Sequence, residues 1–195
     1  MLGLINRAIQ CFLRDTFGDA GWQATARAAG VGKDGFEPML HYEMAETEAL
    51  IAAATGVLDR PRESLLEDLG TYLVSHPNLE PLRRLLRFGG TGFRDFLMTL
   101  EDMPGRGRLA LPDLDLPMLT LEEVGADRYV LTCRSPVPGA GHVVLGLLRA
   151  MADDYGALVL LEHLGAGPEG ERVSVVLLDT AHWAGRRFDL TAAEV

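Results

Sequence analysis

The fold is decided by residues 118–179, which read MLTLEEVGADRYVLTCRSPVPGAGHVVLGLLRAMADDYGALVLLEHLGAGPEGERVSVVLLD. Four runs rich in Val, Leu, Thr and Tyr predict β-strands at 118–124, 128–133, 157–164 and 172–179. Short glycine-containing turns join the first run to the second and the third to the fourth, so two hairpins are expected. Between the hairpins, the apolar residues of Ala140–Tyr155 recur at helical spacing. The stretch therefore predicts a four-stranded antiparallel sheet crossed by one long helix.

The residues before this stretch predict helices. Apolar residues recur at helical spacing in six segments, at 2–13, 22–29, 46–58, 61–75, 78–88 and 93–100. Gly18 separates the first two segments, and the glycine- and proline-containing residues 105–117 predict irregular chain ahead of the sheet. A helical N-terminal half followed by an antiparallel sheet makes the expected class α+β, with helices and sheet segregated.

The length of the chain predicts one domain. With 195 residues it can bury a core of ordinary size without disulfides or structural metals. We expect residues 1–180 to form this domain, and residues 181–195 are interpreted as a C-terminal tail that docks or frays.

Charge and hydropathy argue against two classes of partner. The net charge is -10, with 18 basic against 28 acidic residues, whereas nucleic-acid binding draws on clustered Lys and Arg. No run approaches the roughly 18 unbroken apolar residues that a membrane helix needs. Arg7 and Arg14 interrupt the N-terminal apolar stretch, which lacks a basic leader. The sequence therefore predicts a cytoplasmic protein with no nucleic-acid partner and no membrane insertion.

Motifs for catalysis or metal binding are not found. There is no G-x-S-x-G elbow, and Gly89–Gly92 lacks the Lys of a phosphate-binding loop. Cys11 and Cys133 have no C-x-x-C spacing and are interpreted as buried thiols. The arginine cluster 83–87 and the acid pair Asp153-Asp154 are interpreted as solvated helix surface. We expect neither an enzyme nor a metal site.

Several local runs resemble one known family. They are Met1–Ile9, Phe17–Trp22, Leu111–Pro117 and Ser135–Gly139. With the order of elements, they make the chain similar to the heme-nitric oxide/oxygen binding (H-NOX) family from residue 1 to about 179. The resemblance implies a ferrous heme held by one histidine. It also implies that Ile5 presses on the porphyrin and that Pro117 packs on the heme face.

Two heme anchors of that family are replaced in this sequence. Counting back from Leu111-Pro112-Asp113, the resemblance places the axial histidine at Pro104. The Y-x-S-x-R tripod that binds the heme propionates falls on Cys133, Ser135 and Val137, so the Ser alone is kept. Losing the Arg removes a charge-assisted clamp of about 1.5 to 3 kcal/mol. The metal ligand and the propionate clamp are lost together.

Other residues are alternative ligands for heme iron. Met98 and Met103 lie near the expected ligand position, and a thioether can bind heme iron. The simpler interpretation is that Met98 fills the core and Met103 ends a helix. The resemblance places His142 where family members put a distal residue, so it remains a ligand, a distal donor or a surface residue. The other histidines, at 41, 76, 163 and 182, show no ligand spacing with one another.

The resemblance implies two hypotheses for function. In the first, the chain is a sensory domain that binds heme or another flat apolar ligand between its two halves. Ile5, Met98, Pro104, Pro117, Cys133, Ser135 and His142 are then the pocket positions. In the second, side chains fill the cavity and the domain is a heme-free interaction module. Both imply relay to a signalling partner such as a histidine kinase or a nucleotide cyclase.

Overall fold

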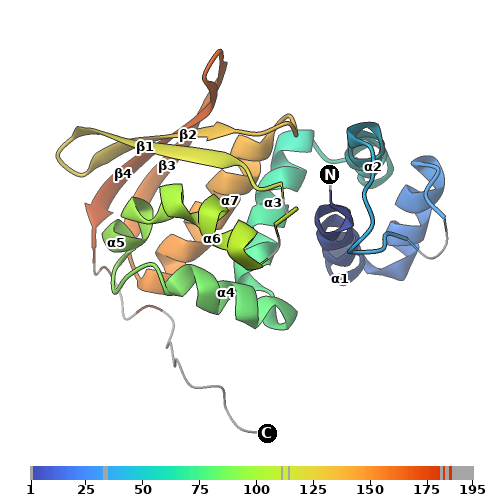
Figure 1. The fold of residues 1–195 in the computed structure, drawn as a ribbon, viewed down its shortest axis with the longest axis horizontal. Helices are drawn as coiled ribbons and strands as arrows, with labels where there is room; N and C mark the ends of the chain where they lie inside the picture. The colour runs from blue at the N-terminus through green and yellow to red at the C-terminus, as the bar shows by residue number, and fades with distance from the viewer. Residues whose placement is uncertain are drawn as a thin grey trace, which may run out of the picture.

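The computed structural model describes residues 2–32, 35–110, 112–113, 115–180, 182 and 185. Helices come first along the chain and strands last, which confirms the α+β class (Figure 1). The helices before the sheet are α1 (Gly3–Ala28), α2 (Met44–Leu58), α3 (Arg62–Ser75), α4 (Glu80–Arg87), α5 (Phe93–Met98) and α6 (Met103–Ala110). The predicted tail, 181–195, lies outside the described residues except at positions 182 and 185.

Helix α1 contains the break that the sequence predicts. Gly18 has φ +76° and ψ 170°, which is not a helical conformation, and helical residues continue on both sides of it. A residue without a Cβ adopts a positive φ at little steric cost. The two predicted segments are therefore one element with a kink at Gly18.

Helix α6 corrects the prediction of irregular chain after residue 105. A 3-10 turn at Leu100–Asp102 leads directly into Met103–Ala110, which is helical despite Gly105 and Gly107. Pro104 is the second residue of this helix, where its fixed φ suits the first turn and the helix needs no N–H from it. Pro104 therefore favours the start of α6.

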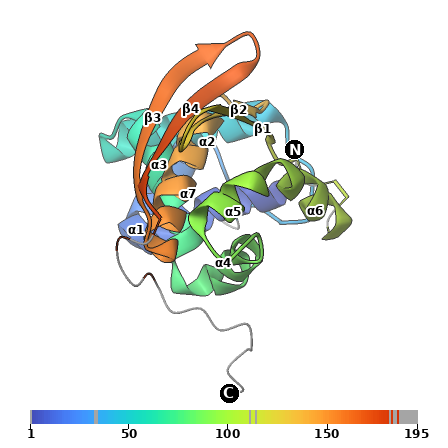
Figure 2. The same cartoon turned by 90° about the vertical axis from the view of Figure 1, so that its left-hand side faces the viewer.

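The sheet has the predicted composition. Its strands are β1 (Met118–Gly125), β2 (Arg128–Arg134), β3 (Leu158–Gly167) and β4 (Gly170–Asp179), in the order β1-β2-β4-β3 with every pair antiparallel. Helix α7 (Ala140–Tyr155) connects the two hairpins and packs against the sheet, with α3 at its side (Figure 2). The four-stranded sheet with one crossing helix is confirmed.

Two separate apolar cores lie on either side of α3. The N-terminal core joins the helices α1 to α3 through Ile9, Phe12, Leu13, Trp22, Leu50, Ile51, Leu65, Leu66 and Leu69. The C-terminal core joins α5, α7 and the sheet through Phe93, Phe96, Leu97, Leu100, Tyr129, Leu131, Leu148, Met151, Val173 and Val175. The place where a ligand would lie between the two halves is therefore flanked by cores that are each already packed.

The crossing of α3 and α7 links the two halves. A Cβ added at Gly70 would collide with the carbonyl oxygen of Val143, and one at Gly146 with that of Glu67. The two helix backbones therefore approach closely because each presents a glycine. The Thr71 hydroxyl donates a hydrogen bond of 3.3 Å to the carbonyl oxygen of Gly146.

The C-terminal end of α7 corrects the prediction of solvated charges. Asp154 is 1% exposed; its Oδ1 accepts a 2.7 Å hydrogen bond from Arg83 Nε, and its Oδ2 lies 3.3 Å from Arg87 Nη1. Burial lowers the pKa of Arg83, but the hydrogen bonds and charges of Asp154 and Glu80 outweigh it and raise that pKa. Arg83 therefore remains a cation. The prediction failed because α4 packs over Asp154, which periodicity within α7 does not reveal.

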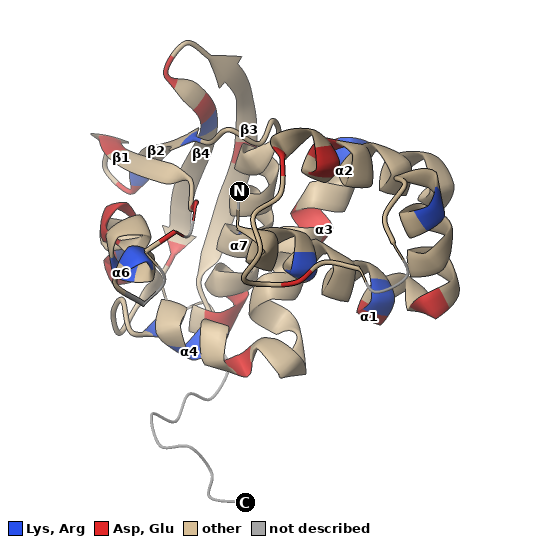
Figure 3. Ribbon diagram, turned by 45° about the vertical axis from the view of Figure 1, so that its right-hand side comes forward, with Lys and Arg blue, Asp and Glu red and all other residues tan. Residues whose placement is uncertain are grey.

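Acidic and basic positions are interspersed in the view of Figure 3, without a continuous basic face. Among the described residues, no helix is both long and apolar enough to cross a membrane.

Candidate functional site

The position that the resemblance assigns to the axial histidine holds a side chain that cannot bind iron. Pro104 is buried in the first turn of α6, and its ring nitrogen is part of the peptide bond. Met103, beside it, is partly buried against the C-terminal core, and it begins α6 rather than ending a helix. Met98 is 49% exposed on α5, so the expectation that it fills the core is wrong.

The residue that the resemblance assigns to the first tripod position lies inside the C-terminal core. Cys133 is 2% exposed on β2, opposite Leu119 of β1 and Glu171 of β4. Burial, with a smaller contribution from the negative charge of Glu171, raises the pKa of the Cys133 thiol to about 12. The thiol is therefore neutral at physiological pH, which agrees with the prediction of a buried thiol. It is a poor donor to a carboxylate.

The remaining tripod positions make local contacts. The Oγ of Ser135 accepts a 3.1 Å hydrogen bond from the backbone N–H of Val137, and the Val137 side chain packs against the N-terminal core. Ile5 also packs against the N-terminal core, and Pro117 is partly buried ahead of β1. Cys133 thus belongs to the C-terminal core, whereas Ile5 and Val137 pack against the N-terminal core.

Two surface cavities lie away from these residues. One, of about 260 Å³, is lined by Arg149, Ala152, Asp153 and residues 157–161. The other, of about 240 Å³, is lined by Arg94, Asp127 and residues 177–180. None of the seven predicted pocket residues lines either cavity.

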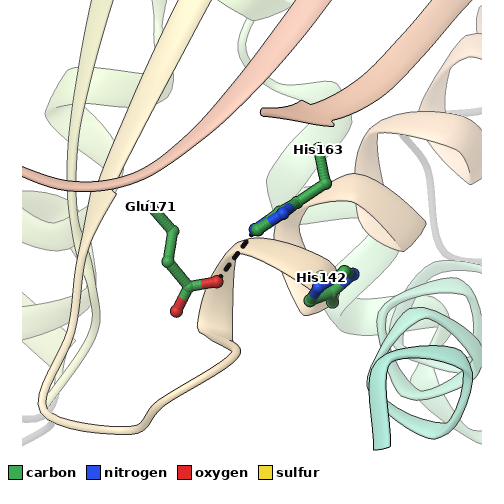
Figure 4. Close-up of side chains that lie close together, drawn as sticks. All are labelled: His142, His163 and Glu171. Atoms are coloured by element: carbon green, nitrogen blue, oxygen red, sulfur yellow. Dashed lines mark hydrogen bonds and ion pairs between the residues drawn. The ribbon is translucent and has the colours of Figure 1, made fainter. Parts of the chain in front are cut away.

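His142 instead belongs to a polar cluster at the N-terminal end of α7. Its ring stacks on that of His163 from β3, with centroids 3.9 Å apart and planes at 17°. His163 Nε2 lies 3.0 Å from Glu171 Oε2 on β4, and His142 Nδ1 lies 3.2 Å from Glu67 Oε1 on α3. Figure 4 shows the His163 ring directed at Glu171 with His142 beside it. We call Glu67, His142, His163 and Glu171 the histidine cluster.

The sequence did not predict the histidine cluster, although it held part of the signal. In the β3–β4 hairpin His163 pairs with Val173, so Glu171 is two residues along the opposite strand. Such diagonal neighbours share one face of a hairpin and are within reach of long side chains. The contact of Glu67 with His142 depends on the α3–α7 crossing, for which the sequence carries no local signal.

The residues present do not fit a histidine-ligated heme. Pro104 offers no lone pair for iron, and Cys133 and Val137 provide no charged donor for propionates, so Ser135 alone of these positions keeps a hydroxyl that can donate to one. His142, the polar alternative, is directed at Glu67 and His163 rather than at any other predicted pocket residue.

Comparison with known proteins identifies the family. The Haem-NO-binding family model matches residues 2–163, so the chain belongs to the Haem-NO-binding, or H-NOX, family. This family binds heme, and its domains act as sensors rather than as catalysts. Soluble guanylate cyclase gcy-31 of Caenorhabditis elegans is 25% identical over 154 residues, which are 79% of this chain and 22% of that protein. The match thus spans about a fifth of that relative's length.

Solved structures share the fold. An H-NOX protein from S. oneidensis in the Fe(II) state, a triple mutant, matches with a TM-score of 0.77 at 17% identity over 92% of this chain and 97% of that chain. The unliganded Fe(II) H-NOX protein from K. algicida matches with a TM-score of 0.74 at 16% identity over 96% of this chain and 100% of that chain. The fold is therefore that of H-NOX domains, as the sequence predicted.

Proposed function

We propose that this chain is an H-NOX signalling domain that relays to a partner protein without a histidine-ligated heme. The observation that carries the proposal is Pro104, buried in the first turn of α6, at the position to which the resemblance assigns the axial histidine. The burial of Cys133 and the packing of Val137 on the N-terminal core support it, because both replace polar propionate contacts by apolar ones.

The partner is a signalling protein such as a histidine kinase or a nucleotide cyclase. The likeness to a protein named as a soluble guanylate cyclase supports the cyclase class. Without a bond between iron and an axial histidine, the domain signals through its surface. A switch would then act by shifting populations between two conformations.

Binding of heme or of another flat apolar ligand is the second candidate. Ile5 and Pro117, which the resemblance assigns to porphyrin contacts, are both kept and are partly rather than fully buried. The affinity of a ligand held by such contacts alone would depend on the apolar area that it buries and not on coordination of a metal.

An absorbance spectrum separates the two candidates. The protein is expressed with added heme and purified, and bound heme is quantified as the pyridine hemochrome. The proposal predicts a folded, colourless protein by circular dichroism and absorbance. A stoichiometric Soret band would overturn it, and a change of that band in His142→Ala would assign the iron ligation to His142.

A further inference from the structure

Three residues of the histidine cluster, on α7, β3 and β4, bring metal-ligating atoms together. The ligand atoms of His142, His163 and Glu171 all lie within 4.8 Å of one another. Their side chains are 15%, 16% and 15% exposed, so a small ion in solvent can reach them. The cluster therefore combines partial burial with access.

Glu67 prepares His142 for coordination. Its Oε1 lies 3.2 Å from His142 Nδ1 and accepts a hydrogen bond from the tautomer that carries its proton there, which leaves the lone pair on Nε2. Arg149 holds the other oxygen of Glu67 at 3.2 Å. A carboxylate that binds the far nitrogen of a histidine is the usual outer partner of a metal-binding imidazole, because it fixes the tautomer and the ring orientation.

We propose that His142 Nε2, His163 Nε2 and Glu171 Oε2 form a binding site for a divalent transition metal ion, with Zn²⁺ as the best fit. Two imidazoles and one carboxylate are ligands that zinc accepts in a tetrahedral site, with water in the fourth position. The ion would tie the N-terminal end of α7 to the β3–β4 hairpin, with Glu67 as the positioning residue on α3.

Binding requires a defined rearrangement. Tetrahedral zinc with bonds of 2.0 to 2.1 Å places its ligand atoms about 3.3 Å apart, so the three side chains must draw together and the stacked rings must turn. At present the Gly165 N–H donates to His163 Nδ1 at 3.2 Å, so His163 Nε2 carries the proton. Coordination displaces that proton from Nε2, and Nδ1 becomes the donor. Gly165, at φ +91° where the β3 register shifts, can turn its amide away.

The same change reaches the start of α7. Glu171 Oε1 accepts the N–H of Gly139 at 2.7 Å, and Oε2 accepts the N–H of Gly141 at 3.2 Å. Ligation through Oε2 keeps the shorter bond and gives up the longer one. Gly141 leaves room for the ion's ligands, since a Cβ there would lie 2.9 Å from His163 Nε2.

The test uses the heme-free, chelator-treated full chain. Zn²⁺ is titrated by calorimetry, and Co²⁺ is added as a spectroscopic probe of tetrahedral coordination. We expect one ion per chain, an intense visible Co²⁺ band, and a rise in Tm with Zn²⁺ because the ion binds the folded state. Glu67→Ala should weaken binding about 10- to 100-fold, with partial recovery in Glu67→Gln, which keeps an acceptor for Nδ1.

His163→Ala and His142→Ala each remove a ligand and should weaken binding beyond the loss seen in Glu67→Ala. His41→Ala, at an exposed histidine outside the cluster, is the matched control and should bind as the parent chain does. Circular dichroism establishes that each variant is folded. Absence of binding to the parent chain, or equal affinity in the parent and in both ligand variants, would overturn the proposal.

Discussion

The positions that the resemblance assigns to heme binding and the contacts of helix α7 differ in the polar groups that they offer. Pro104, Cys133 and Val137, which the resemblance assigns to the heme anchors, offer apolar or neutral groups. Helix α7 has charged partners at both ends, in the histidine cluster and in the Asp154 contacts with Arg83 and Arg87. These polar contacts of α7 therefore need no cofactor.

The largest expected effect comes from the buried charge on α7. Asp154→Asn should lower the free energy of unfolding by about 3 to 5 kcal/mol, because it leaves the buried Arg83 with the more exposed Glu80 as its remaining carboxylate partner. Urea denaturation followed by circular dichroism measures this. The exposed neighbour serves as control: Asp153→Asn should change stability by about 0.5 kcal/mol or less. Equal effects of the two substitutions would contradict the structural role of Asp154.

A polar group placed at a pocket position should have an intermediate effect. Cys133→Ser introduces a hydroxyl into the C-terminal core and should cost about 1 to 3 kcal/mol of unfolding free energy. The same change at the partly buried Cys11 should cost less. If Cys133→Ser were neutral, a polar environment at this position would be indicated and the contrast with α7 would weaken.

The Cys133 thiol should also make stability depend on alkaline pH. Its pKa is about 12 in the folded chain against 9.0 for an unperturbed thiol, because it is buried and lies near Glu171. The folded state therefore binds more protons in this window, and the contribution is complete below pH 9.0 and lost as the pH rises towards 12. The loss should not exceed about 1.4 kcal/mol per pH unit.

Denaturation of the parent chain and of Cys133→Ala, at neutral pH and in this alkaline window, isolates the contribution of Cys133 to the pH dependence of stability. Tyr72, whose pKa burial and Asp15 raise, contributes in the same direction in both proteins. A steeper decline in the parent is expected. Parallel profiles would show that Cys133 ionises as easily in the folded as in the unfolded chain.

The smallest effect is expected at Ser135. Ser135→Ala removes an acceptor for the partly buried N–H of Val137, and water can replace it, so the loss should be about 1 kcal/mol or less. Thermal denaturation measures it. A loss as large as that of Asp154→Asn would mean that the pocket positions still carry a polar network.

Local pattern predicted the sheet well and the site poorly. The hairpins and α7 follow from periodicity and turn residues, so the predicted segment 140–155 matches the bounds of α7. Helix α6 was missed because its two glycines weaken the helical signal, although Pro104 suits a first turn. The burial of Asp154 and the contact of Glu67 with His142 arise from helices that meet only in the folded chain. No spacing rule within one element can predict them.

The most direct test of the account is the heme content of four proteins reconstituted side by side: the parent chain, Pro104→His, Val137→Arg and the double variant. We expect that the parent and Val137→Arg stay without heme, that Pro104→His gains little, and that the double variant gains a Soret band, since it supplies the ligand and the propionate clamp together. Stoichiometric heme in the parent chain would contradict the account.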